Sequence, residues 1–159
     1  MIIQIVKAFD SDAPSIFEMQ QRTFNPLLEK YQDYDINPAN EKIDKVVRRI
    51  NHPKGGVYKI LVDDIFAGAI CMYWKQERLA YWISPMFISP DFQGKGIAQK
   101  SILLFEEMFP NIKTWELATI VEEKRNCYLY EKMGYKQTGE YRKVNENTTL
   151  VYYKKVCNS

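Results

Sequence analysis

The residues most suited to chemistry in this chain form the segment Gln93–Ala98, with the sequence QGKGIA. It follows an apolar run and leads into a stretch with helical spacing, so the pattern predicts a strand, a loop and a helix. Two glycines let the backbone curl and place no Cβ between it and a ligand. The first N–H groups of the helix lack partners and lie at the positive end of its dipole. The loop is therefore predicted to bind an anion such as a diphosphate.

A second segment, Asn126–Tyr135, has the sequence NCYLYEKMGY and lies one predicted strand further along. Asn126 and Tyr130 are four residues apart, so on a helix they share a face. Together the two segments resemble the acyl-CoA pyrophosphate loop, Gln-x-x-Gly-x-Ala, and the second signature of the GNAT superfamily of N-acyltransferases. The resemblance implies acetyl-CoA as cosubstrate, no metal, and the following cofactor-binding residues: Phe87, Ile88, Gln93, Gly94, Lys95, Gly96, Ile97, Ala98, Asn126 and Tyr130.

The implied reaction gives Tyr130 a role as general acid. An amine that attacks a thioester must lose a proton, and the departing thiolate is helped by a proton from a nearby acid. Glu116, on the strand before the second segment, is our candidate for the base that accepts the amine proton, directly or through water. Alternation along a strand also allows Glu116 to be an ordinary solvent-facing residue.

The acceptor is predicted to bind at the connection around residues 25–35, which is rich in acidic and aromatic side chains. Asp33 could attract a cationic amine, and Tyr31 and Tyr34 could pack against its carbon chain or its charge. We therefore expect a small cationic amine such as a polyamine or aminoglycoside, with a protein N-terminus or a lysine as the alternative. A solvated acidic loop without a binding role is the other interpretation.

Two further functions fit the same loop. A non-catalytic acyl-CoA sensor or partner module would keep the loop without an evident base. A nucleotide-phosphate loop is weaker, because Gly94-Lys95-Gly96 lacks the Gly-x-x-x-x-Gly-Lys-Ser/Thr spacing.

Length and composition predict one domain over residues 1–159. Hydrophobic residues make up 46% and charged residues 26% of the chain, which is enough apolar surface for a folded core. The net charge of +2, without a long run of like charges, does not favour a nucleic-acid partner. Three widely spaced cysteines and the lack of a signal or membrane-spanning pattern predict a cytoplasmic protein that does not bind membranes.

The predicted fold class is a mixed α/β (α+β) fold like that of the GNAT superfamily, with a mostly antiparallel sheet of about seven strands and about four flanking helices. Pro85 should interrupt its strand with a bulge or an unpaired stretch, which the resemblance implies is where the pantetheine arm pairs. The aromatic last strand could pair across a homodimer, or could be an ordinary sheet edge. The expected elements are strands at 2–6, 57–62, 65–74, 78–88, 114–120, 135–141 and 148–156, and helices at 12–24, 37–51, 96–109 and 122–133.

Overall fold

A single sheet of seven strands runs through the protein, whose computed structural model describes residues 1–75 and 79–157. The strand order is β1-β2-β3-β4-β5-β7-β6, and every pair is antiparallel except β4 with β5. This confirms the predicted fold class. The strands are β1 (Ile3–Lys7), β2 (Gly55–Val62), β3 (Ile65–Lys75), β4 (Ala80–Ile88), β5 (Thr114–Ile120), β6 (Lys136–Asn145) and β7 (Thr148–Val156), and the α-helices are α1 (Ala13–Tyr31), α2 (Ile43–Ile50), α3 (Ile97–Glu107) and α4 (Lys124–Lys132).

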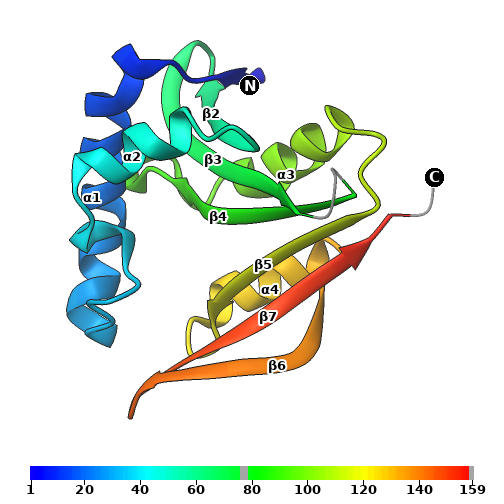
Figure 1. Cartoon of the computed structure of the whole chain (residues 1–159). Helices are drawn as coiled ribbons and strands as arrows, with labels where there is room; N and C mark the ends of the chain where they lie inside the picture. Colours follow the sequence, from blue (N-terminus) through cyan, green and yellow to red (C-terminus); the bar gives the residue numbers. More distant parts are fainter. Residues whose placement is uncertain (76–78, 158–159) are drawn as a thin grey trace.

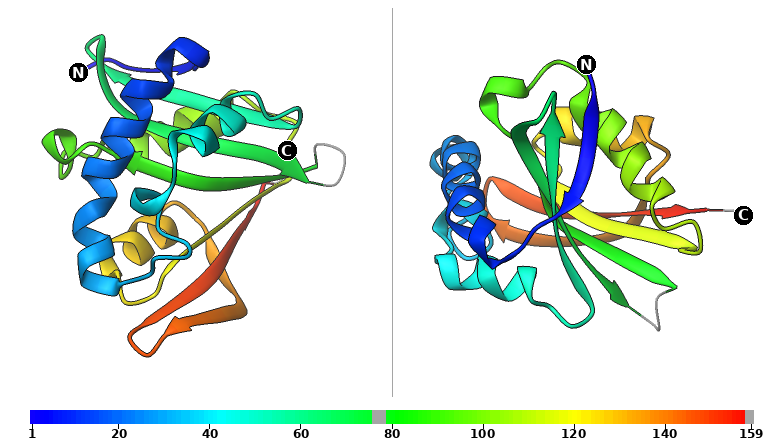
Figure 2. Two further views of the ribbon diagram at one scale, coloured as in Figure 1. Left: turned by 60° about the vertical axis from the view of Figure 1, so that its left-hand side comes forward. Right: turned by 90° about the horizontal axis from the view of Figure 1, so that it is seen from above.

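Helices cover both faces of the sheet (Figures 1 and 2). Helices α3 and α4 pack on one face over a large apolar core that includes Phe105, Trp115 and Tyr153. Helices α1 and α2 pack on the other face over a smaller core around Ile16 and Val57. Side chains of β2, β3 and β4 reach both cores, as expected for strands buried on both sides, whereas β6 is exposed along most of its length.

The sheet splits between its two parallel strands. In β4 only residues 80–82 pair with β5, where their partners are residues 114–116. Beyond these residues the two strands diverge (Figure 1). On the other side of β4, the register against β3 shifts where Ser84 and Pro85 lie opposite Cys71. This is the bulge that Pro85 predicted. The proposed first residue of this strand, Arg78, lies outside the described residues.

The connection predicted at residues 25–35 is largely helix, because α1 continues to Tyr31 instead of ending near Phe24. The prediction of a surface loop there was wrong. Phe24, Leu27, Leu28 and Tyr31 repeat at helical spacing, and their packing outweighs the helix-breaking tendency of Pro26, which lies inside the helix. Gln32 caps the end of the helix, and its backbone adopts a left-handed conformation with φ 52°.

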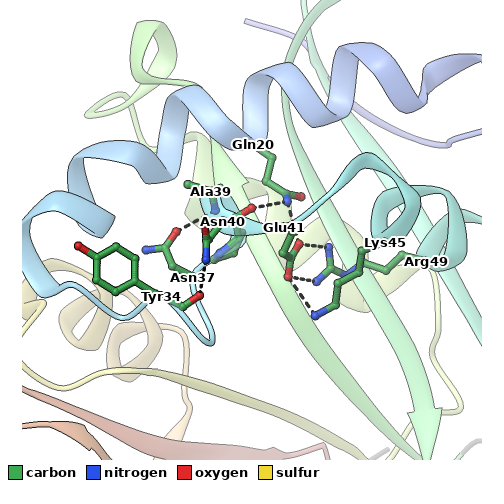
Figure 3. A network of polar contacts seen from close by, with 9 residues as sticks. Gln20, Tyr34, Asn37, Ala39, Asn40, Glu41, Lys45 and Arg49 are labelled. Atoms are coloured by element: carbon green, nitrogen blue, oxygen red, sulfur yellow. Dashed lines mark hydrogen bonds and ion pairs between the residues drawn. The ribbon is translucent and has the colours of Figure 1, made fainter.

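The second helix begins later than predicted. Asn37 caps a short 3-10 turn at Pro38–Asn40, and the chain is extended at Glu41 before α2 starts at Ile43. Figure 3 shows the polar network that holds this arrangement. The Glu41 carboxylate accepts two hydrogen bonds of 2.7 Å from the Arg49 guanidinium, and Gln20 Nε2 donates to Glu41 and to the Pro38 carbonyl. These contacts fasten the α1–α2 connection to both helices.

The last strand is not a sheet edge. Strand β7 lies between β5 and β6, so both of its edges are paired within the chain. The predicted pairing of this strand across a dimer, and its alternative as an edge, were therefore both wrong. The sequence order of two hairpin strands does not say which one inserts next to β5.

Over the described ranges, we find no helix whose length and apolar character would let it cross a bilayer.

Candidate active site

A cavity of about 550 Å³ opens where β4 and β5 diverge. Its walls come from α1, the end of β4, the loop before α3, and α4. Most of the predicted cofactor-binding residues line it: Phe87, Ile88, Gln93, Gly94, Gly96, Ile97, Ala98, Asn126 and Tyr130. The fold thus brings the two sequence segments onto one cavity, as the resemblance to the GNAT superfamily implied.

The loop before α3 has the conformation that its glycines permit. Gly94 and Gly96 have φ values of 78° and 76°, in the left-handed region that favours glycine. A Cβ at either position would meet no protein atom within 4 Å, so their backbone faces open space. Gln93 Nε2 donates a 2.9 Å hydrogen bond to the Ile88 carbonyl and closes the loop onto the end of β4. The N-terminus of α3 therefore presents free N–H groups towards the cavity.

Tyr130 lines the cavity, and its hydroxyl is available as a hydrogen-bond donor. Among the described residues, none forms a hydrogen bond with it, while its ring packs against Tyr135 and Tyr153 at centroid distances of 5.9 and 6.2 Å. Burial, with a smaller contribution from Cys127, raises the pKa of Tyr130 to about 12. The phenol therefore stays protonated at neutral pH and can donate.

The rim of the cavity at α4 carries polar and charged groups. Asn126 is held weakly, since its Nδ2 donates to Thr119 Oγ1 at 3.4 Å. Arg125 and Glu123 also line the cavity. Lys95 is not among the lining residues, and its Nζ lies 5.5 Å from the centroid of the Phe92 ring. Among the described residues, Arg125 is therefore the one cationic side chain that lines the cavity.

Glu116 lies at the point where the sheet splits, on the opposite face from the core of α3 and α4. It pairs with Trp82, the last β4 residue that is in register with β5. Its neighbours Trp115 and Leu117 point into the core, so the Glu116 side chain points to the face of α1 and α2. It is half-buried, and it does not line the cavity itself.

The three residues predicted to bind the acceptor do not line the cavity. Tyr31 is buried in α1, and its hydroxyl donates to Glu123 Oε2 at 3.1 Å. Asp33 is buried too, and its carboxylate accepts from Asn37 Nδ2 at 3.0 Å. Tyr34 is 55% exposed. Of the three, only Tyr31 contacts a residue that lines the cavity, namely Glu123. Asp33 instead stabilises the turn after α1 through its hydrogen bond with Asn37.

Helix α1 forms one wall that the sequence analysis missed. The cavity is lined on this side by Thr23, Phe24 and Leu27. The Phe24 ring packs edge-on against that of Phe87, with a centroid distance of 5.7 Å. The Thr23 hydroxyl is buried and has no hydrogen-bond partner within the described part of the chain. The helical spacing of Phe24 and Leu27 could have revealed this wall, had the helix been extended through Pro26.

A sheet that splits between two parallel strands, beside a glycine loop at a helix N-terminus, defines an acyl-CoA-dependent acyltransferase fold. The comparison with protein families agrees: the model of the acetyltransferase (GNAT) family matches residues 13–135. The chain belongs to this family, whose members are acetyl-CoA-dependent N-acetyltransferases. No curated protein sequence matches it.

Solved structures with the same fold cover nearly the whole chain. A GNAT-family acetyltransferase from Streptococcus agalactiae has a TM-score of 0.81 at 14% identity, covering 99% of this chain and 96% of its own. The ribosomal-protein-S18-alanine N-acetyltransferase of Escherichia coli has a TM-score of 0.78 at 10% identity, with 98% and 94% covered. Spermidine N-acetyltransferase from Vibrio cholerae, in complex with CoA and spermine, has a TM-score of 0.75 at 16% identity, with 97% and 95% covered.

Proposed function

We propose that this enzyme transfers the acetyl group of acetyl-CoA to a primary amine by direct attack, and that the acceptor is a small cationic amine. The observation that carries the proposal is the cavity at the split of β4 and β5, which both sequence segments line. Cofactor and amine would meet there from opposite faces of the sheet. The solved relatives named above include enzymes for a polyamine and for a protein substrate, so the fold alone does not select the acceptor.

In this proposal the cofactor lies along the free edge of β4. Backbone groups of β4 beyond Trp82 have no β5 partner, so they are available to the pantetheine arm and to the thioester oxygen. The diphosphate binds the N–H groups of the Gly94–Gly96 loop and the first turn of α3, and Arg125 supplies a counter-charge. Asn126, on the α4 rim, contacts the pantetheine arm.

The chemical step needs one base and one acid. The cationic acceptor first releases one proton to solvent. The nitrogen of the neutral amine then attacks the thioester carbon to form a tetrahedral oxyanion, and Glu116 accepts the second proton from this nitrogen, directly or through water. The oxyanion then collapses, the C–S bond breaks, and the sulfur takes the proton of the Tyr130 hydroxyl. The products are the N-acetyl amine and CoA. Proton transfer from the protonated base through solvent restores Tyr130.

The proposal includes no metal, and places the protein in the cytoplasm as one domain.

The first test is thermal unfolding with acetyl-CoA, CoA or ATP at about millimolar concentration. A ligand that binds only the folded protein raises the melting temperature by mass action. We expect acetyl-CoA and CoA to raise it and ATP to leave it unchanged. No shift with any of them would mean that the Gly94–Gly96 loop is only a turn, and the acyltransferase function would be withdrawn. A positive result justifies a screen of amines for release of free CoA, which would separate an enzyme from a non-catalytic acyl-CoA sensor.

A further inference from the structure

Aromatic side chains gather on the sheet face of α1 and α2, at the last paired residues of β4 and β5. Tyr73, Trp82 and Glu116 are direct neighbours across β3, β4 and β5, so their side chains share one face. Tyr152 of β7 joins them, with its ring centroid 6.1 Å from that of Trp82. The His52 ring stacks on that of Tyr73, with a centroid distance of 5.5 Å. We call Tyr73, Trp82 and Tyr152 the aromatic wall.

A cation already occupies the aromatic wall. The Nζ atom of Lys75, the last residue of β3, lies 4.5 Å from the centroid of the Trp82 ring. This is the geometry of a cation–π interaction, and tryptophan is the ring that binds cations best. The Trp82 face is thus accessible to a primary ammonium on an aliphatic stem, which is the group that Lys75 presents.

The carboxylate beside the wall is available. Glu116 is half-buried, and it forms no hydrogen bond or ion pair with any residue in the described ranges. It lies close enough to Tyr73 to influence it: burial first, and the Glu116 carboxylate second, raise the pKa of the Tyr73 hydroxyl. A partly desolvated carboxylate without a partner favours a cation from outside the chain.

We propose that the aromatic wall and Glu116 bind the ammonium group and carbon stem of the acceptor, and that Lys75 Nζ holds this position until the acceptor displaces it. The inference rests on the proposed function, because it assumes that the bound ammonium releases a proton to solvent and then attacks as the neutral amine. It moves the acceptor site from residues 31–35 to the strands. The wall then determines specificity, and Lys75 acts as a resident competitor that weakens acceptor binding.

The experiment measures binding without turnover. The protein is labelled with 5-fluorotryptophan, and the Trp82 resonance is assigned by its loss in Trp82→Phe. Pentylamine, a cation at neutral pH, is titrated beside pentanol, its uncharged counterpart, with and without CoA. We expect pentylamine to shift the Trp82 resonance and leave that of the buried Trp115 unmoved, and pentanol to shift neither. Equal shifts with both probes, or none with pentylamine, would overturn the proposal.

Two variants test the wall and its competitor. Trp82→Leu should weaken pentylamine binding about fivefold or more. Because this variant lacks the Trp82 resonance, binding is measured from the shift of a wall tyrosine in fluorotyrosine-labelled protein. Lys75→Met should strengthen it about threefold, whereas the control Lys136→Met, on the exposed strand β6, should not change it. An unchanged affinity in Lys75→Met would remove Lys75 from the proposal. Stabilisation by CoA, measured on each variant, reports folding and the cofactor site, so failure of the proposed function would be seen separately.

Discussion

The two faces of the sheet are built in different ways. On the face of α3 and α4, a large apolar core that includes Phe105 and Trp115 supports the glycine loop and α4, which line the cavity opposite its α1 wall. On the face of α1 and α2, the core is smaller, and polar contacts such as the Glu41–Arg49 pair fasten the helices. The side chains that we propose to act there, such as Glu116 and Trp82, come from separate strands.

This difference indicates how the two halves of the site can vary. A ligand held by backbone N–H groups and a glycine loop makes few demands on side chains, so one short segment suffices to specify it. In our proposal, the acceptor side depends on single side chains brought together by strand register. A change of one of them should alter which amine is bound without disturbing the cavity. Changes on the two faces should therefore have separable effects on catalysis and on cofactor binding.

The largest expected effect comes from Glu116→Gln. Loss of a general base should lower kcat by about a hundredfold or more. Binding of CoA should stay the same, because Glu116 does not line the cavity. Steady-state kinetics and isothermal titration with CoA measure the two effects. Glu140→Gln, an exposed carboxylate on β6, is the control and should leave both unchanged. A Glu116→Gln enzyme with normal kcat would require another base.

Tyr130→Phe should lower kcat by at least about tenfold, with little loss of cofactor binding. The pKa of about 12 lies above the usual value for tyrosine, so the hydroxyl stays protonated as pH rises and ionises only near that pH. The ratio of wild-type to variant kcat should therefore be constant from about pH 6 to about pH 9. A ratio that falls with pH in this range would show that Tyr130 titrates there and would contradict its role as a neutral donor.

Tyr153→Phe is the matched control for this prediction. Its ring packs against Tyr130, but its hydroxyl donates to Glu131 at 2.7 Å and it does not line the cavity. The hydroxyl also accepts a 3.2 Å hydrogen bond from Gln137 Nε2, so the substitution loses two hydrogen bonds. It should cost about 2 kcal/mol of stability and should leave kcat near the wild-type value. Equal losses of kcat in both variants would point to packing of the ring cluster, not to proton transfer by Tyr130.

The sequence predicted most of the residues that line the cavity on the side of β4, α3 and α4, because the signals there are local. The glycine loop, the bulge at Pro85 and the face shared by Asn126 and Tyr130 each depend on a few neighbouring residues. The α1 wall was missed because Asn25-Pro26 is typical of a helix end, and only tertiary packing of Phe24 and Tyr31 shows that the helix continues. The aromatic wall depends on register between β3, β4, β5 and β7, and a single sequence does not specify which strands become neighbours.

The smallest expected effects come from alanine substitutions at two glycines, which distinguish backbone strain from contact with the cofactor at the glycine loop. Gly96 and Gly139 have φ values of 76° and 93°, and at both positions a Cβ would have open space. Alanine at either position should therefore cost about 1 kcal/mol of stability, measured by urea unfolding. Only Gly96 lines the cavity, so only Gly96→Ala should also weaken CoA binding, by about threefold to tenfold, because the added methyl group keeps the diphosphate from the backbone. Unchanged CoA binding in Gly96→Ala would mean that the diphosphate does not approach this residue, and that the cofactor is held by the rest of the cavity.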